Sequence, residues 1–241
     1  MANFDTHLVV AAGASAILSG SMLSMEIILP TEAVMAFALG TFGGLMPDID
    51  SDNSKSISIG FNILSLLVTI LAVFMKSSTY SIVEMLIMSL VIFSIVRFGM
   101  IIVFRNISRH RGMFHSIPVA VMWGVITAII MHLFFGLSSL LSWVYGIMMS
   151  SGYIVHLILD EIYSVDLRNK RIKKSAGTAL KLFKLKTTTD KIQNILIYLS
   201  LFFLIRIAPD FSAVQEALFS ADAFQHFINV LLPYDGKWFF H

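Results

Sequence analysis

Apolar residues gather in seven long blocks, and this feature limits what the chain can fold into more than any other. The blocks lie near residues 8–25, 33–46, 57–75, 80–104, 117–135, 137–160 and 192–208. All but the second are close to the roughly 17–25 residues with which a helix crosses a bilayer. In lipid every backbone polar group must be hydrogen-bonded internally, which favours helices over open strands. The sequence therefore predicts an all-α, polytopic membrane bundle of about seven apolar helices.

The composition supports this class of protein. Of 241 residues, 57% are hydrophobic and 13% are charged, whereas soluble domains carry about 25% charged residues. This excludes a soluble globular enzyme and a disordered tail. The absence of cysteine excludes disulfides and thiolate metal sites. Because the N-terminus lacks the basic region of a secretory signal, we expect the first block to belong to a single domain spanning 1–241.

Two segments depart from the pattern of simple spans. The second block is short, contains Gly40, Gly43 and Gly44, and stops at Pro47. Its length fits a re-entrant or tilted helix as well as a full span, and its glycines would let it approach a neighbouring helix closely. In the C-terminal segment 209–241, apolar residues recur at helical spacing over 213–232, with polar residues between them. This pattern predicts an amphipathic helix on the far membrane face.

The distribution of basic residues predicts the orientation. The segment 166–191 holds nine of the 17 lysines and arginines. They are Arg168, Lys170, Arg171, Lys173, Lys174, Lys181, Lys184, Lys186 and Lys191. Further arginines follow the fourth block, two spans away and hence on the same side. Basic loops face the cytoplasm, so we expect the N-terminus and the loop 166–191 to be cytoplasmic. This loop has only one aromatic residue, so we expect it to contact anionic lipid and not nucleic acid.

Ionisable residues near spans are costly and call for a reason. Here they form four groups, each separated from the next by an even number of blocks. The groups are His7; Asp48, Asp50 and Asp52; His110 and His115; and His156 with Asp160. An even number of crossings brings all four to the same, cytoplasmic face. His132 lies 17 residues beyond His115 in the same predicted helix, about 25 Å away, and is excluded.

These residue types indicate a metal site. Imidazoles with carboxylates suit zinc, manganese or iron better than calcium. His156 and Asp160 are four residues apart, so a helix presents both on one face. The predicted ligands are His7, Asp48, Asp50, His110, His115, His156 and Asp160, enough for one or two ions. Taken singly, each group also fits a plainer role, such as an interfacial histidine, a solvated acidic loop or a structural hydrogen bond.

The same segments resemble the YdjM-like family of bacterial inner-membrane proteins. The resemblance rests on His7, on Leu-Met-Pro-Asp-Ile-Asp-Ser (45–51), on His-Arg-Gly-Met-Phe-His-Ser (110–116) and on the helix from Gly152 to Asp160. Residues 174–181 look like a further family segment. The family is described as metal-dependent hydrolases and is also labelled LexA-binding or LexA-regulated. The resemblance therefore implies a hydrolase in the bacterial inner membrane.

The function expected from these observations is metal-dependent hydrolysis of a phosphoester, a lipid or lipid-linked phosphate, at the cytoplasmic face. Asp50 and Asp160 are the expected catalytic carboxylates. Three cations are expected to hold the anionic substrate: Arg109, Arg111 and Arg97. A non-catalytic membrane protein with a structural metal and a lipid- or regulator-binding loop remains the alternative. A transporter fits less well, because its site should lie near the midplane.

Overall fold

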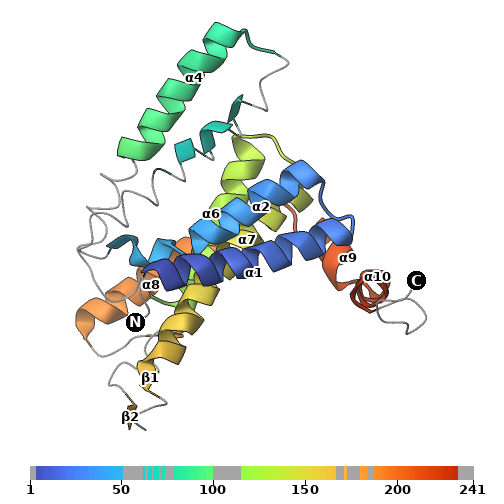
Figure 1. The fold of residues 1–241 in the computed structure, drawn as a ribbon. Helices are drawn as coiled ribbons and strands as arrows, with labels where there is room; N and C mark the ends of the chain where they lie inside the picture. Colours follow the sequence, from blue (N-terminus) through green and yellow to red (C-terminus); the bar gives the residue numbers. More distant parts are fainter. Residues whose placement is uncertain are drawn as a thin grey trace.

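The computed structural model describes residues 4–50, 62, 65–66, 68–70, 72–73, 79–99, 115–166, 171–172, 180–183 and 187–232 (Figure 1). The helices of these parts are α1 (Phe4–Ser24), α2 (Pro30–Gly43), the 3-10 helix η1 (Met46–Asp50), α4 (Ile82–Ser94) with a π-helical turn η2 (Ile95–Gly99), α6 (Ile117–Leu133), α7 (Ser139–Ser164), α8 (Thr188–Ile207), α9 (Ser212–Phe219) and α10 (Ala221–Leu231). A two-residue antiparallel ladder joins β1 (Val165–Asp166) to β2 (Arg171–Ile172). The predicted all-α class is confirmed.

Three of the described helices are long and apolar enough to cross a membrane. They are Asp5–Ser24, Ile82–Gly99 and Ser139–Tyr163, and α8 with α9 makes a fourth if this bent pair is one span. The helices α2 and α6 are shorter, with 14 and 17 residues. Most of the predicted block 57–75 lies outside the described residues. The chain is thus a polytopic membrane protein, and the count of seven spans stays a prediction.

Helix α7 is the centre of the bundle and packs against α1, α2, α6 and α9. Its N-terminal half contributes Tyr145 and Met148 to one buried cluster with residues of α2. Its C-terminal half contributes Tyr153 and Leu157 to a second cluster with Phe42. Helix α4 stands away from the bundle in Figure 1, and none of its described residues is buried. The position of α7 matters because its last two turns carry two of the predicted metal ligands.

Glycines set how closely α2 and α7 approach each other. A Cβ built on Gly43 would collide with the Met149 carbonyl oxygen, and one on Gly152 would collide with the Gly40 carbonyl oxygen. The backbones therefore touch at two successive levels, as small residues allow in membrane helix pairs. The close approach predicted for the second block is confirmed for its pairing with α7.

The turn from α1 to α2 is closed by a helix-ending motif of backbone hydrogen bonds. The Glu26 N–H donates to the Leu23 carbonyl and the Ile27 N–H to the Met22 carbonyl, each at 3.0 Å. Glu26 has a φ of 56°, the left-handed conformation that this motif requires. The motif reverses the chain, so that α2 runs back along α1 and delivers η1 to the level of His7.

The C-terminal part turns sharply after α8. The axes of α8 and α9 meet at 92°. The predicted amphipathic segment 213–232 is present as two helices, α9 and α10, which are separated at Ser220. The Ser220 hydroxyl accepts from the Ala223 N–H at 3.0 Å and so caps α10.

Candidate metal centre

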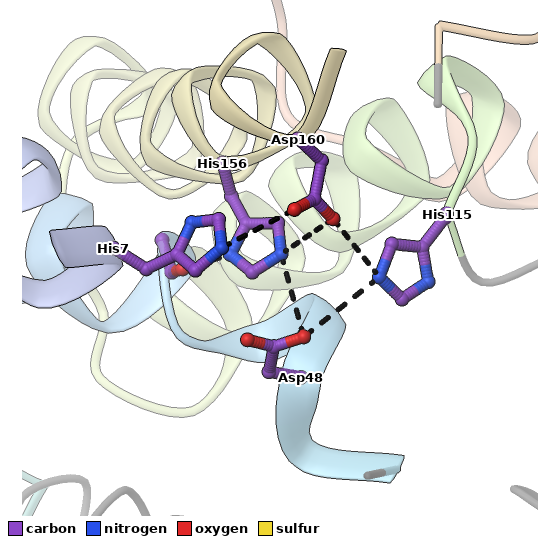
Figure 2. A network of polar contacts seen from close by, with 6 residues as sticks. His7, Asp48, His115, His156 and Asp160 are labelled. Atoms are coloured by element: carbon purple, nitrogen blue, oxygen red, sulfur yellow. Dashed lines mark hydrogen bonds and ion pairs between the residues drawn. The ribbon is translucent and has the colours of Figure 1, made fainter. Parts of the chain in front are cut away.

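Five of the seven predicted ligands meet at one end of the bundle (Figure 2). His7 comes from the start of α1 and Asp48 from η1. His115 lies two residues before α6, and His156 and Asp160 lie on the last turns of α7. Four separate segments therefore converge, which is what the even spacing of the ionisable groups predicted.

Local structure explains how each segment reaches this point. On α7 the spacing of four residues puts His156 and Asp160 on one face. After α2 the chain tightens into η1, in which Pro47 is fully buried, and Asp48 follows it. Pro118 in the first turn of α6 fixes the beginning of that helix, and Ser116 is the residue that precedes the helix. His115 is thereby held just outside the helix.

The contacts form a nearly closed ring. His156 Nε2 lies 3.6 Å from Asp160 Oδ2 and 3.6 Å from Asp48 Oδ1. His115 Nε2 lies 3.8 Å and 3.9 Å from the same two oxygens. His7 Nε2 approaches the other Asp160 oxygen, Oδ1, at 3.3 Å. All three histidines thus direct Nε2 toward carboxylate oxygens, mostly at distances longer than an ordinary hydrogen bond.

The ring is buried on one side and open on the other. The side chains of His7, His156 and Asp160 are 1%, 0% and 5% exposed, whereas those of Asp48 and His115 are each 23% exposed. Among the described residues, no hydrogen-bond partner meets either ring nitrogen of His7, Nε2 of His156 or either oxygen of Asp160. Leaving a buried polar atom without a partner costs about 1–3 kcal/mol. Such a group of atoms calls for an occupant that binds them.

A backbone contact orients the central histidine. The carbonyl oxygen of Gly44, at the end of α2, lies 2.7 Å from His156 Nδ1. A carbonyl can only accept, so Nδ1 carries the proton and donates it. In the neutral ring this leaves a lone pair on Nε2, which faces the two carboxylates. No sequence pattern predicts this partner, because the acceptor is a main-chain atom.

The donor set fits a transition-metal cation. In a tetrahedral site with ligands about 2.0–2.1 Å from the ion, neighbouring ligand atoms are roughly 3.3–3.4 Å apart. The observed contacts of 3.3–3.9 Å lie close to this spacing. In two overlapping groups the ligand atoms all lie within 4.8 Å of one another, as holding one ion requires: His7 with His156 and Asp160, and His156 with Asp48 and His115. Both groups contain His156, whose Nε2 faces Asp160 and Asp48 at 3.6 Å each, so the two groups adjoin at this nitrogen.

The other predicted site residues are only partly placed. Asp50 ends η1, but its side chain lies outside the described part of the structure, as do His110, Asp52, Arg109 and Arg111. Arg97 lies in η2 with its guanidinium 5.6 Å from the centre of the Phe98 ring. The substrate-binding role of Arg97, like that of Arg109 and Arg111, stays a prediction.

Sequence reasoning left His132 out of the metal site and did not predict the role of Gly152 beside it. His132 lies near the opposite end of α6, where its Nδ1 contacts the Leu137 carbonyl at 2.8 Å. Gly152 lies one turn before His156 and lets α2 pack close enough for Gly44 to reach that histidine. Its spacing could have predicted this role. Gly152 lies four positions before His156, so the two residues share a helix face, and a small residue there allows another helix to pack closely.

Comparison with protein families gives a match over more than half of the chain. A family model described as YdjM inner membrane protein matches residues 1–169. The match covers all five converging side chains and ends before α8. No curated protein and no solved structure matches the chain.

Proposed function

Because the chain belongs to the YdjM inner membrane protein family, we propose that it is a membrane-embedded, metal-dependent hydrolase. The observation that carries the proposal is the convergence of five ionisable side chains from four segments on one partly open ring. Ionisable groups are expensive in a membrane and are kept there for function. The imidazole and carboxylate donors, with no sulfur, are those that hydrolytic zinc sites use.

In this proposal His7, His156 and Asp160 form the buried part of the metal centre, and Asp48 and His115 complete it. His110, which precedes His115 in the sequence, and Asp50, which follows Asp48, would extend the ligand set. Zinc fits this donor set best, and manganese or iron also suit it. When bound, the cation supplies a Lewis acid that favours ionisation of water and polarises a phosphoryl oxygen.

The chain's own groups have distinct tasks. The Gly44 carbonyl fixes the ring of His156, and Asp160 presents one oxygen to His7 and the other to His115 and His156. On the open side, Asp48 is the carboxylate best placed to orient water and accept its proton. The partial exposure of this side supports a catalytic site, because a catalytic metal keeps an open coordination position that a structural one lacks.

The proposed substrate is a phosphoester carried by a lipid. The ring lies where helices end, at a level that a lipid head group can reach while its tails stay among apolar helices. Arg109, Arg111 and Arg97 supply cations for a phosphate, and the basic loop 166–191 would raise the local concentration of anionic lipid. By the positive-inside rule, these cations also support a site on the cytoplasmic side.

A screen of phospholipids and lipid-linked phosphates in proteoliposomes tests the proposal. We expect metal-dependent release of phosphate or of a phosphorylated head group, which chelator and His115→Ala both abolish. His226→Ala, on the exposed surface of α10, is the matched control and keeps full activity. If metal-loaded, folded protein turns over none of these lipids, the lipid hydrolase is wrong.

One observation favours a second candidate, a structural metal site. His7, His156 and Asp160 are almost completely buried and join α1 to α7. A cation held by these three alone would stabilise the bundle without catalysis. In that case His115→Ala would leave metal binding and folding unchanged, and no turnover would be found with any lipid.

A further inference from the structure

The last described helix, α10, has an apolar face that the described structure leaves largely uncovered. Phe224, Phe227, Ile228 and Leu231 recur at the spacing of one helix face. Asp222, Gln225 and Asn229 lie on the opposite face. No residue of α10 is buried, and Phe224 and Leu231 are 63% and 59% exposed. Such a helix is stable only if its apolar face meets another surface.

The bend between α8 and α9, called the elbow below, sets the direction in which α10 leaves the bundle. The indole N–H of Trp143, near the start of α7, donates to the Pro209 carbonyl at 2.9 Å. The Trp143 ring packs edge-to-face on Phe211 at 5.0 Å, and Val214 of α9 is fully buried. The 92° turn between α8 and α9 is thus held against the N-terminal end of α7.

The elbow lies at the opposite end of α7 from the metal centre. Trp143 and Asp160 are 17 positions apart on this helix, which corresponds to about 26 Å. This length nearly equals the roughly 30 Å hydrocarbon core of a bilayer. When the ring of ligands lies at one interface, the elbow therefore lies at the other. A chain that crosses along α8 and then turns by 92° continues along the membrane surface.

The charges identify the surface that α10 meets. The two helices after the elbow contain Glu216, Asp222 and His226 but no lysine or arginine. Helices that bind anionic lipid depend on such cations, at about 1 kcal/mol each. Apolar side chains are also exposed on α8, at Phe202, Phe203 and Ile207, and at Phe219 at the end of α9. Both sides of the elbow therefore present apolar side chains that suit lipid.

We propose that α10 is an interfacial anchor that inserts Phe224, Phe227, Ile228 and Leu231 into a zwitterionic lipid surface, on the membrane face opposite the metal centre. The anchor and the Trp143 elbow fix the depth of α7 in the bilayer. They thereby hold the ligand ring at the level of the other interface. The proposal concerns lipid binding at a second place in the molecule and does not depend on hydrolysis.

Spin labels on single cysteines test this in the full chain, which contains no native cysteine. Phe224→Cys places a label on the apolar face, and Asn229→Cys on the polar face is the matched control. Both side chains are exposed, so neither change removes packing. In phosphatidylcholine liposomes we expect the ratio of oxygen to water-soluble nickel-chelate collisions to be several-fold higher at 224 than at 229. Added anionic lipid should leave this ratio unchanged.

Three results would overturn the proposal. Equal access of the nickel chelate to both labels would show that α10 stays in water. Spin–spin broadening at 224 that dilution with unlabelled protein removes would show that a second copy covers the face. Insertion only in the presence of anionic lipid would show that charge, and not the apolar face, controls binding.

Discussion

The imidazole of His7 lies flat against that of His156, with ring centres 3.7 Å apart and planes inclined by 13°. Two imidazolium ions at this spacing would repel each other strongly in a buried site. Histidine binds metals through a neutral ring, so two stacked imidazoles can both serve as ligands. The stacking also joins the first helix of the chain to the sixth apolar block, so the centre depends on tertiary packing and not on one local motif.

The Gly44 carbonyl should control metal affinity through His156. A Cβ at position 44 would collide with the Ala11 side chain, so Gly44→Ala should shift the end of α2 and its carbonyl. Loss of such an outer hydrogen bond lowers metal affinity about 10–100-fold. Ala11→Gly removes the obstacle, and the double variant should regain most of the affinity in a competition assay with a chelating dye. Wild-type affinity in Gly44→Ala, or no recovery in the double variant, would contradict this.

The contact between α2 and α7 should tolerate no side chain at position 152. Gly152→Ala places a Cβ against the Gly40 carbonyl. We expect a loss of about 3 kcal/mol or more in unfolding free energy, because backbone must move in a close-packed interface. Gly13→Ala is the control, since a Cβ there meets nothing within 4 Å, and it should be neutral or slightly stabilising. Denaturant titrations in detergent compare the two, and equal stabilities would refute the close approach.

The strained residue between α1 and α2 offers a stabilising change. Glu26 adopts a left-handed conformation that glycine adopts without penalty. Glu26→Gly should therefore raise the unfolding free energy by roughly 0.5–1 kcal/mol. The same titration measures it, and Gly136→Ala, at a φ of 66° after α6, should show a loss of similar size. A loss of stability in Glu26→Gly would show that its side chain contributes more than its backbone costs.

How much of this could be read from the sequence differs between parts of the molecule. The helical class and the shared face of His156 and Asp160 follow from periodicity and block length, which are local properties. The meeting of His7, Asp48 and His115 with them followed from counting crossings, a rule imposed by the membrane. The stacking of His7 on His156 and the Gly44 hydrogen bond depend on how three helices pack. No spacing along the chain encodes those contacts.

In the C-terminal segment, too, the local pattern could be predicted from the sequence and the tertiary contacts could not. Its amphipathic pattern was visible over 213–232, but the break at Ser220 and the 92° elbow were not. The elbow is held by a side chain 66 residues earlier, Trp143, which binds the Pro209 carbonyl. Such a long-range contact leaves no mark on the local periodicity.

The membrane topology leads to a simple test. With the basic loop 166–191 in the cytoplasm, α8 carries the chain across, so reporter fusions at Lys191 and His241 should report opposite sides. Lys191 should report the cytoplasm. Reporters on the same side would contradict the seven-span arrangement and would require α8 and α9 to form a re-entrant loop.

The central claim is that five side chains bind a divalent cation, and metal analysis of the purified protein tests it most directly. Elemental analysis and X-ray absorption should show bound metal with nitrogen and oxygen neighbours at about 2.0–2.2 Å. Because His156 belongs to both possible ligand sets, His156→Ala should lose this metal while remaining folded, and His226→Ala should keep it. Metal-free wild-type protein after zinc loading, or an unchanged metal spectrum in His156→Ala, would contradict the account.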